Sequence, residues 1–167
     1  MKYPARGFTL IELLVVIAIM TVIGAFTLAN YRSFGEDQNL KNAVLDIQSQ
    51  LRTAQTNATS NTKCVSGFGA TWQVEFANVN TINLKCSAST NPQKALQLVA
   101  NITIQPVSGI GSNCPPAPPF TINFDPLTGK VGLGDIRCTA LTITLRNNKT
   151  GSTQSLGIEQ GGRIYAQ

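Results

Sequence analysis

The sequence contains no histidine, and only 13 % of its 167 residues are charged. The absence of histidine removes serine–histidine and cysteine–histidine nucleophile pairs, histidine-bound metals and the commonest general base. One near pair of carboxylates remains in the C-terminal part, Asp125 and Asp135, and both flank glycine-containing turns, where aspartate is common for local backbone reasons. These two could supply oxygen ligands to calcium, but their spacing matches no calcium-binding loop. We therefore expect no enzyme, no cofactor and no metal site.

The shortage of charge also argues against a protein that binds nucleic acid through a dense basic face. The formal net charge is +5, but this figure includes Lys2 and Arg6 at the start of the chain. Asparagine, threonine, serine and glutamine are abundant instead. Such a polar, weakly charged surface is common in proteins outside the cell.

One long apolar run, residues 8–29, is interrupted by Glu12 and Thr21. Its length of roughly 20 residues is enough to span a membrane. A carboxylate within hydrocarbon costs about 2.5 to 3.5 kcal/mol, so Glu12 requires a cationic partner inside the membrane or inside an assembly. Lys2 and Arg6 would hold the N-terminus in the cytoplasm and place the rest of the chain outside.

Two simpler interpretations leave part of this pattern unexplained. A conventional secretory signal, cleaved after the small-residue site at 27–29, would have a shorter apolar run and no Glu12. A plain single-pass anchor accounts for the length of the run. It does not account for Glu12 or for the Gly7-Phe8 pair at its start.

The order Gly7-Phe8-Thr9-Leu10-Ile11-Glu12, between a basic leader and an apolar run, resembles the class III signal of type IV pilins and of the pseudopilins of type II secretion. The resemblance implies that a prepilin peptidase cuts between Gly7 and Phe8 and methylates the new amine of Phe8. It also implies three kinds of partner, namely other pilin or pseudopilin subunits, the peptidase and an inner-membrane assembly platform. The protein would sit in the cytoplasmic membrane before it joins a filament.

Cleavage would supply the partner that Glu12 needs. The amine of Phe8 is a cation at neutral pH, and it would lie about one helical turn from Glu12 or on a neighbouring subunit. A buried carboxylate paired with a buried ammonium is tolerable, whereas either group alone is not. Charge pairing of Glu12 with Phe8 is therefore expected to guide assembly.

Hydrophobic periodicity divides the rest of the chain. We expect a leader at 1–7, a transmembrane and filament-core helix at 8–29, an amphipathic helix at 30–62 and a disulfide-stapled β-sheet domain at 63–167. Apolar residues that recur at steps of three and four predict a helical stripe facing the core: Leu40, Val44, Ile47, Leu51, Ala54 and Ala58. Residues 33–39 include Gly35 and several poor helix formers, so we expect a bend or local melting there.

From about residue 71 the apolar period changes to two. Six or seven strands are predicted near 72–76, 82–84, 96–104, 120–124, 141–145, 154–158 and 163–165. Residues 125–129 form a strong turn signal, and 106–119, with five prolines, is predicted to be an irregular loop. The fold class expected is α+β and pilin-like, with the long N-terminal helix packed on an antiparallel sheet.

All four cysteines lie after the apolar run, on the exported side, where an even number favours two disulfides. Of the three connectivities we favour Cys64 with Cys86 and Cys114 with Cys138, because each pair closes a local loop. Each bridge would contribute roughly 3 kcal/mol in the loop-entropy model. A four-cysteine zinc site is disfavoured because the chain has no Cys-x-x-Cys pair.

The C-terminal half also resembles the globular domain of GspH- or FimT-type minor pseudopilins and minor pilins, on the basis of its strands and the closing Leu156-x-Ile158-x-x-Gly161-Gly162-Arg163-Ile164. The function expected is that of a structural subunit of a secretion pseudopilus or a type IV pilus. A main pilin and a minor pilin that binds DNA for uptake are the alternatives. DNA would contact a basic patch, if the fold forms one: Arg137, Arg146, Lys149 and Arg163.

Overall fold

The computed structural model describes residues 7–63, 71–86, 89 and 91–166, without the side chains of 26–33. The chain divides into two compact units, Met1–Gly35 and Glu36–Gln167. We call them the N-terminal unit and the globular unit, and each is described by itself.

One helix, α1 (Leu10–Thr59), runs through the boundary between the units. It is continuous through Gly35, so the local melting predicted for 33–39 is wrong. The helix ends in a Schellman motif, in which Asn61 has a φ of 49° and the amide of Thr62 donates to the carbonyl of Asn57. Asparagine tolerates this left-handed conformation better than most residues, which explains why the helix stops here.

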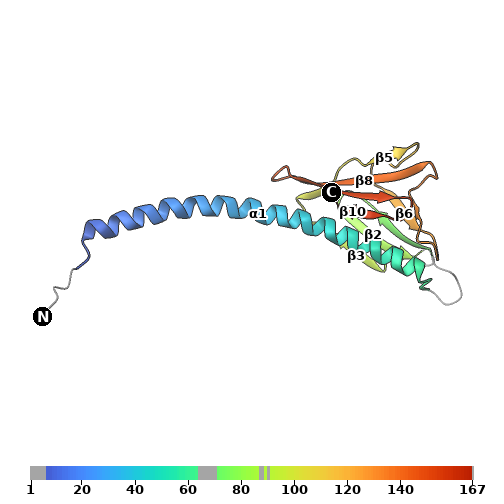
Figure 1. Ribbon diagram of the computed structural model, residues 1–167, viewed down its shortest axis with the longest axis horizontal. Coiled ribbons are helices and arrows are strands. Elements are labelled where there is room, and N and C mark those ends of the chain that lie inside the picture. Colours follow the sequence, from blue (N-terminus) through green and yellow to red (C-terminus); the bar gives the residue numbers. More distant parts are fainter. Residues whose placement is uncertain (1–6, 64–70, 87–88, 90, 167) are drawn as a thin grey trace. The chain divides into compact units, whose positions relative to one another are not determined.

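The strands of the globular unit form two antiparallel sheets (Figure 1). Sheet A has the order β3 (Lys94–Gln97), β2 (Thr81–Cys86), β1 (Trp72–Phe76), β6 (Phe120–Phe124) and β7 (Val131–Gly132). Sheet B has the order β10 (Ile164–Ala166), β9 (Thr153–Glu159), β8 (Cys138–Asn147) and β4 (Ile102–Ile104), and β5 (Ser108–Gly111) also pairs with β8. The α+β class with antiparallel strands is as predicted.

The prediction of one sheet, in contrast, is wrong. After β3 the chain turns at residues 98–101, and β4 pairs with residues 145–147 of β8 instead of staying in sheet A. Strand β5 lies within 106–119, which we predicted to be irregular, and it pairs with residues 138–142 of β8. Alternating burial was visible in the sequence, but these long-range pairings were not.

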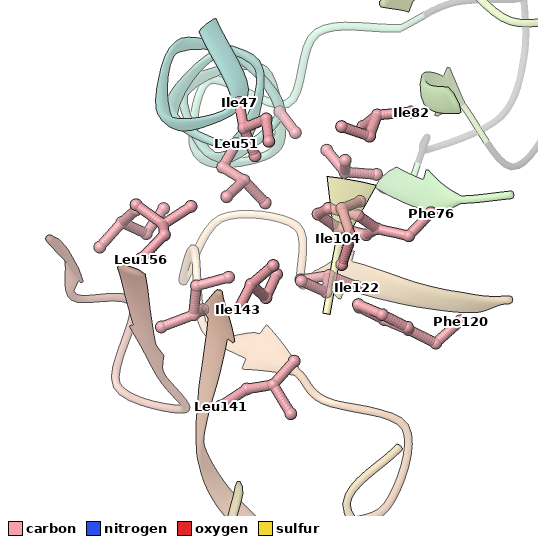
Figure 2. Packing of buried hydrophobic residues seen from close by; sticks show 14 of the residues in the cluster. Ile47, Leu51, Phe76, Ile82, Ile104, Phe120, Ile122, Leu141, Ile143 and Leu156 are labelled. Carbon is pink, nitrogen blue, oxygen red and sulfur yellow. The ribbon is translucent and has the colours of Figure 1, made fainter. Parts of the chain in front are cut away.

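A single hydrophobic core fills the space between the helix and the two sheets. Figure 2 shows Ile47 and Leu51 of the helix facing Ile122 of sheet A and Ile143 of sheet B. All six residues of the predicted helical stripe are buried, so that prediction is confirmed. Because α1 and both sheets contribute to the same cluster, residues 36–59 of the helix are an integral part of the globular unit.

Gln50 is an exception within this core. Its side chain is 2 % exposed, and neither amide atom has a hydrogen-bond partner among the described residues. Burying an amide without compensation costs roughly 1 to 3 kcal/mol in proteins. We therefore expect Gln50→Met, which keeps the shape and removes the polar atoms, to raise the free energy of unfolding by about 1 to 2 kcal/mol.

Urea denaturation of the full chain in detergent micelles, followed by circular dichroism, measures this change. Gln154→Met, at a half-buried position of β9, is the matched control and should change the midpoint little. An unchanged or lower midpoint for Gln50→Met would contradict the expectation. It would mean that a bound water already satisfies the amide.

Candidate functional site

The segment just before the helix holds the predicted cleavage site. Residues 7–9 are not helical, and α1 begins at Leu10. Phe8 is 81 % exposed. The bond between Gly7 and Phe8 therefore lies in exposed, non-helical chain, which is the kind of segment that proteases cut. The remainder of the predicted leader, residues 1–6, lies outside the described residues.

Glu12 takes part in a capping box with Thr9 at the start of α1. The Thr9 hydroxyl donates to Glu12 Oε2 over 3.2 Å and the Thr9 amide donates to the same oxygen over 3.4 Å. In return the Glu12 amide lies 3.4 Å from the Thr9 hydroxyl oxygen. Thr-x-x-Glu is the known signature of this motif, and a carboxylate in the first turn also interacts favourably with the helix dipole.

The capping box corrects one interpretation of the sequence, namely that a plain membrane-anchoring helix does not account for Glu12. The spacing in Thr9-Leu10-Ile11-Glu12 is sufficient to predict this cap. Glu12 therefore has a local role in the single subunit. The proposed pairing with the amine of Phe8 would come in addition, since a carboxylate can accept several hydrogen bonds.

Beyond the cap, the apolar side chains that the structure describes in the N-terminal unit are largely exposed. Leu10, Leu13 and Leu14 are each more than half exposed, as are Ile17 and Ile23. A contiguous apolar surface of this kind is rare in monomeric soluble proteins and indicates contact with other molecules. Among the described residues, no helix meets the length and hydropathy required for a membrane span.

The disulfide predicted between Cys114 and Cys138 is confirmed, with a Cα–Cα distance of 5.0 Å. It connects the proline-containing segment after β5 to the first residue of β8. Cys86 is fully buried and disulfide-bonded, whereas Cys64, its predicted partner, lies outside the described residues. Among the described residues, no cluster of three or more acidic or cysteine side chains could hold a metal ion.

The four basic residues proposed for DNA binding fall into two pairs at opposite ends of sheet B. Arg137 precedes β8, and Arg163 follows β9 at the same end, because Ala140 pairs with Glu159. Arg146 and Lys149 lie at the other end, roughly 30 Å away along β8.

Two of these cations also have carboxylate partners. Lys149 Nζ lies 2.8 Å from Glu36 Oε1, and Arg163 Nη1 lies 3.7 Å from Glu159 Oε1. Arg163 also stacks 4.7 Å over the ring of Tyr165. These positions form no continuous basic track of the kind that phosphate contacts require.

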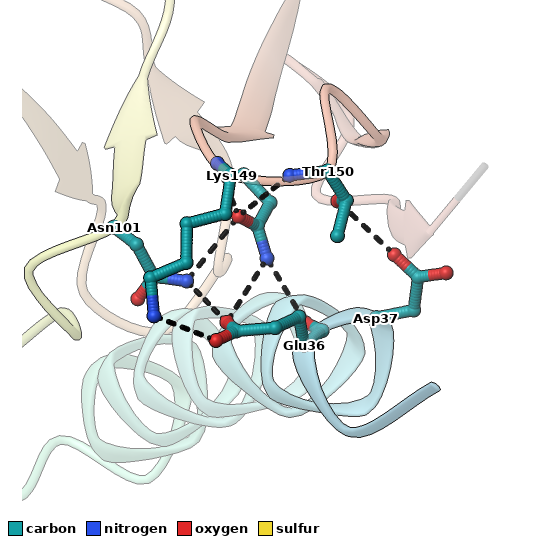
Figure 3. A network of polar contacts seen from close by, with 6 residues as sticks. Glu36, Asp37, Asn101, Lys149 and Thr150 are labelled. Atoms are coloured by element: carbon teal, nitrogen blue, oxygen red, sulfur yellow. Dashed lines mark hydrogen bonds and ion pairs between the residues drawn. The ribbon is translucent and has the colours of Figure 1, made fainter. Parts of the chain in front are cut away.

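A polar network that the sequence did not reveal surrounds Glu36, the first residue of the globular unit (Figure 3). The amide of Asn147 donates to the main-chain carbonyl of Glu36 over 3.1 Å and to its Oε2 over 3.4 Å. Asn101 also donates to Oε2, and the ammonium of Lys149 binds Oε1. The hydrogen bond from Lys149 is the main reason why the pKa of Glu36 is lowered.

The same network continues to the hairpin between β8 and β9. The side-chain oxygen of Asn147 accepts the amide of Lys149 over 2.9 Å, and the Thr150 hydroxyl donates to Asp37 over 3.3 Å. Helix residues 36–37 are thus connected to residues 147–150. No local sequence pattern predicts such contacts, because the partners are more than 100 residues apart.

Comparison with known families identifies the N-terminal segment. A family model for the prokaryotic N-terminal methylation motif, the class III signal of type IV pilins, matches residues 3–28. The resemblance drawn from Gly7 to Glu12 is thereby confirmed, and the chain carries the signal of a type IV pilin-like protein that a prepilin peptidase processes. No curated protein and no solved structure matches the chain. The likeness of residues 63–167 to the GspH or FimT type therefore stays a prediction.

Proposed function

We propose that the protein is a structural subunit of a helical fibre, either the pseudopilus of a type II secretion system or a type IV pilus. It is inserted with its N-terminus in the cytoplasm and anchored by residues 8–29. It is cut after Gly7, methylated on Phe8 and then assembled. The methylation motif at residues 3–28 carries this proposal.

The exposed apolar surface of the N-terminal unit supports it. The apolar side chains from Leu10 to Ile23 are exposed to water in the single chain, so they require lipid or other helices. In a fibre, packed helices would provide that environment, and the amine of Phe8 would provide the cation for Glu12. The same segment thus serves as anchor before assembly and as fibre core afterwards.

The globular unit contributes a stable outer domain in this proposal. Its core joins helix residues 36–59 to both sheets, and the disulfide between Cys114 and Cys138 fixes the segment that follows β5. The chain has no histidine for general acid–base chemistry. The work of assembly would fall to partner proteins, namely the peptidase, an inner-membrane platform and the other subunits.

Intact mass and N-terminal sequence of the protein from its native membrane test the proposal. We expect a chain that begins with N-methylated Phe8 and whose cysteines are all oxidised. Deletion of the peptidase in the same cells is the control, and it should yield the unprocessed chain with Lys2 and Arg6. A mature chain that begins at Asn30 would contradict the proposal, because it would identify an ordinary secreted protein.

A further inference from the structure

A groove on the globular unit brings together Asp125 and Asp135, which lie ten residues apart in the sequence. It has a volume of about 530 Å³ and runs along the edge strand β7 to the turn at Gln160 and Gly161. Cavities of roughly 300 to 1,000 Å³ are typical of sites for small ligands. The groove is therefore large enough for a small polar molecule.

Glycines keep the groove open. Gly132, Gly134 and Gly161 all line it. Among the described residues, a Cβ atom at Gly161 would meet nothing within 4 Å, and one at Gly134 would reach only Pro115, at 4.0 Å. Larger residues at these positions would project side chains into free space. Because the lining glycines have no side chains, main-chain groups along this edge of sheet A are accessible to a ligand.

Four polar side chains of the globular unit reach the groove. Asn123, Asp125, Lys130 and Gln160 line it. None of the four side chains has a hydrogen bond or an ion pair with another described residue. Together they offer carboxylate acceptors, ammonium donors and two amides that can each donate and accept. Both main-chain groups of Gln160 are in use, since its amide donates to Thr139 and its carbonyl accepts from Val131, so its side chain extends from a fixed backbone.

Asp135, in contrast, is held in place by its neighbours. The side-chain amide of Asn113 donates to one carboxylate oxygen over 3.0 Å, and the main-chain amide of Arg137 donates to the other over 2.9 Å. The bond from Arg137 is the main cause of a lowered pKa for Asp135, which therefore stays ionised. Two carboxylates and one ammonium leave the groove with a net negative charge. Phosphates and nucleic acids are disfavoured for this reason.

We propose that this groove binds a neutral carbohydrate. A sugar presents adjacent hydroxyl groups that each donate and accept, and a carboxylate beside an amide can bind two neighbouring hydroxyls at once. Lys130 donates to the remaining hydroxyl oxygens. The exposed side chain of Ile136, 84 % accessible at the rim, covers one apolar face of the sugar ring. This inference does not depend on how the N-terminal unit assembles.

Nuclear magnetic resonance of the full chain in micelles of a zwitterionic detergent without a sugar headgroup tests the proposal. The probes are cellobiose, lactose, maltose and N,N′-diacetylchitobiose, each titrated to about 50 mM so that a Kd on the order of 1 mM is detected. We expect at least one of them to shift the amide signals of residues 131–134 and 160–161. Gln160→Ala and Asp125→Asn should each weaken that binding by about tenfold, the loss of one hydrogen bond to the ligand.

Gln154→Ala is the matched control, because Gln154 lies on β9, outside the groove, and its side chain has no partner among the described residues. It should bind the sugar as the unchanged chain does, and the amide spectra of all three variants should confirm the same fold. No shift with any of the four sugars overturns the proposal. Binding that survives both groove variants overturns the assigned site. Shifts produced at these residues by a polar hexapeptide, with no response to sugars, overturn the ligand class.

Discussion

Glu12→Gln is expected to be inserted and cleaved normally but to join the fibre at a rate reduced by more than about 100-fold. Glutamine at this position still completes a capping box with Thr9, so the start of α1 is preserved. It cannot carry the negative charge that the proposed pairing with the amine of Phe8 requires. Leaving a buried ammonium unpaired costs roughly 3 to 5 kcal/mol, which corresponds to the stated factor.

Sheared fibres and membranes from cells that express the variant, compared by immunoblot, measure this partition. Thr9→Ala is the matched control, because it removes the capping hydroxyl and keeps the carboxylate of Glu12. We expect Thr9→Ala to assemble at close to the normal level, since an N-cap is worth about 1 kcal/mol. The reverse result, with Glu12→Gln normal and Thr9→Ala defective, would mean that the cap and not the charge pair is needed.

The sequence was sufficient for features that depend on local spacing. The helical stripe from Leu40 to Ala58 and the alternation of Val74, Ile122 and Ile143 depend on the period of one element, so they could be predicted residue by residue. The signal from Gly7 to Glu12 is likewise contiguous. Cys114 and Cys138 could be paired because they close a short loop.

Features that depend on pairing across long distances could not be predicted. The alternation of Ile102 and Ile104 shows which residues are buried, but not that β4 leaves sheet A and pairs with β8. The two basic pairs of sheet B are separated by strand register, which no composition reveals. The groove lies where a main-chain hydrogen bond from Val131 to Gln160 joins β7 to a turn about 30 residues later, and no local pattern predicts that contact.

Asn147→Leu is expected to lower the free energy of unfolding of the globular unit by about 2 to 4 kcal/mol. Asn147 is fully buried, and its amide donates to Glu36 while its oxygen accepts the main-chain amide of Lys149. Leucine has a similar volume but leaves the part-buried carbonyl of Glu36 and amide of Lys149 without this partner. Each such group costs roughly 1 to 3 kcal/mol, and the members of one network are lost together.

Urea denaturation of the full chain in micelles, with two matched variants, separates this network from the surface contacts around it. Asn148→Leu changes the neighbouring, exposed asparagine, whose side chain is hydrogen-bonded, among the described residues, only to the Thr103 hydroxyl over 3.4 Å. This variant should change the free energy of unfolding by no more than about 0.5 kcal/mol. Lys149→Met removes an ion pair whose lysine side chain is 65 % exposed. It should lower the free energy of unfolding by no more than about 1 kcal/mol. If Asn147→Leu and Asn148→Leu lower the free energy of unfolding equally, the buried amide of Asn147 does not hold helix residues 36–37 to the hairpin. A clearly larger loss of unfolding free energy for Asn147→Leu would mean that this amide fixes the helix to the sheets where the globular unit begins. In the proposed fibre, strain applied to the N-terminal unit would then be resisted at this point.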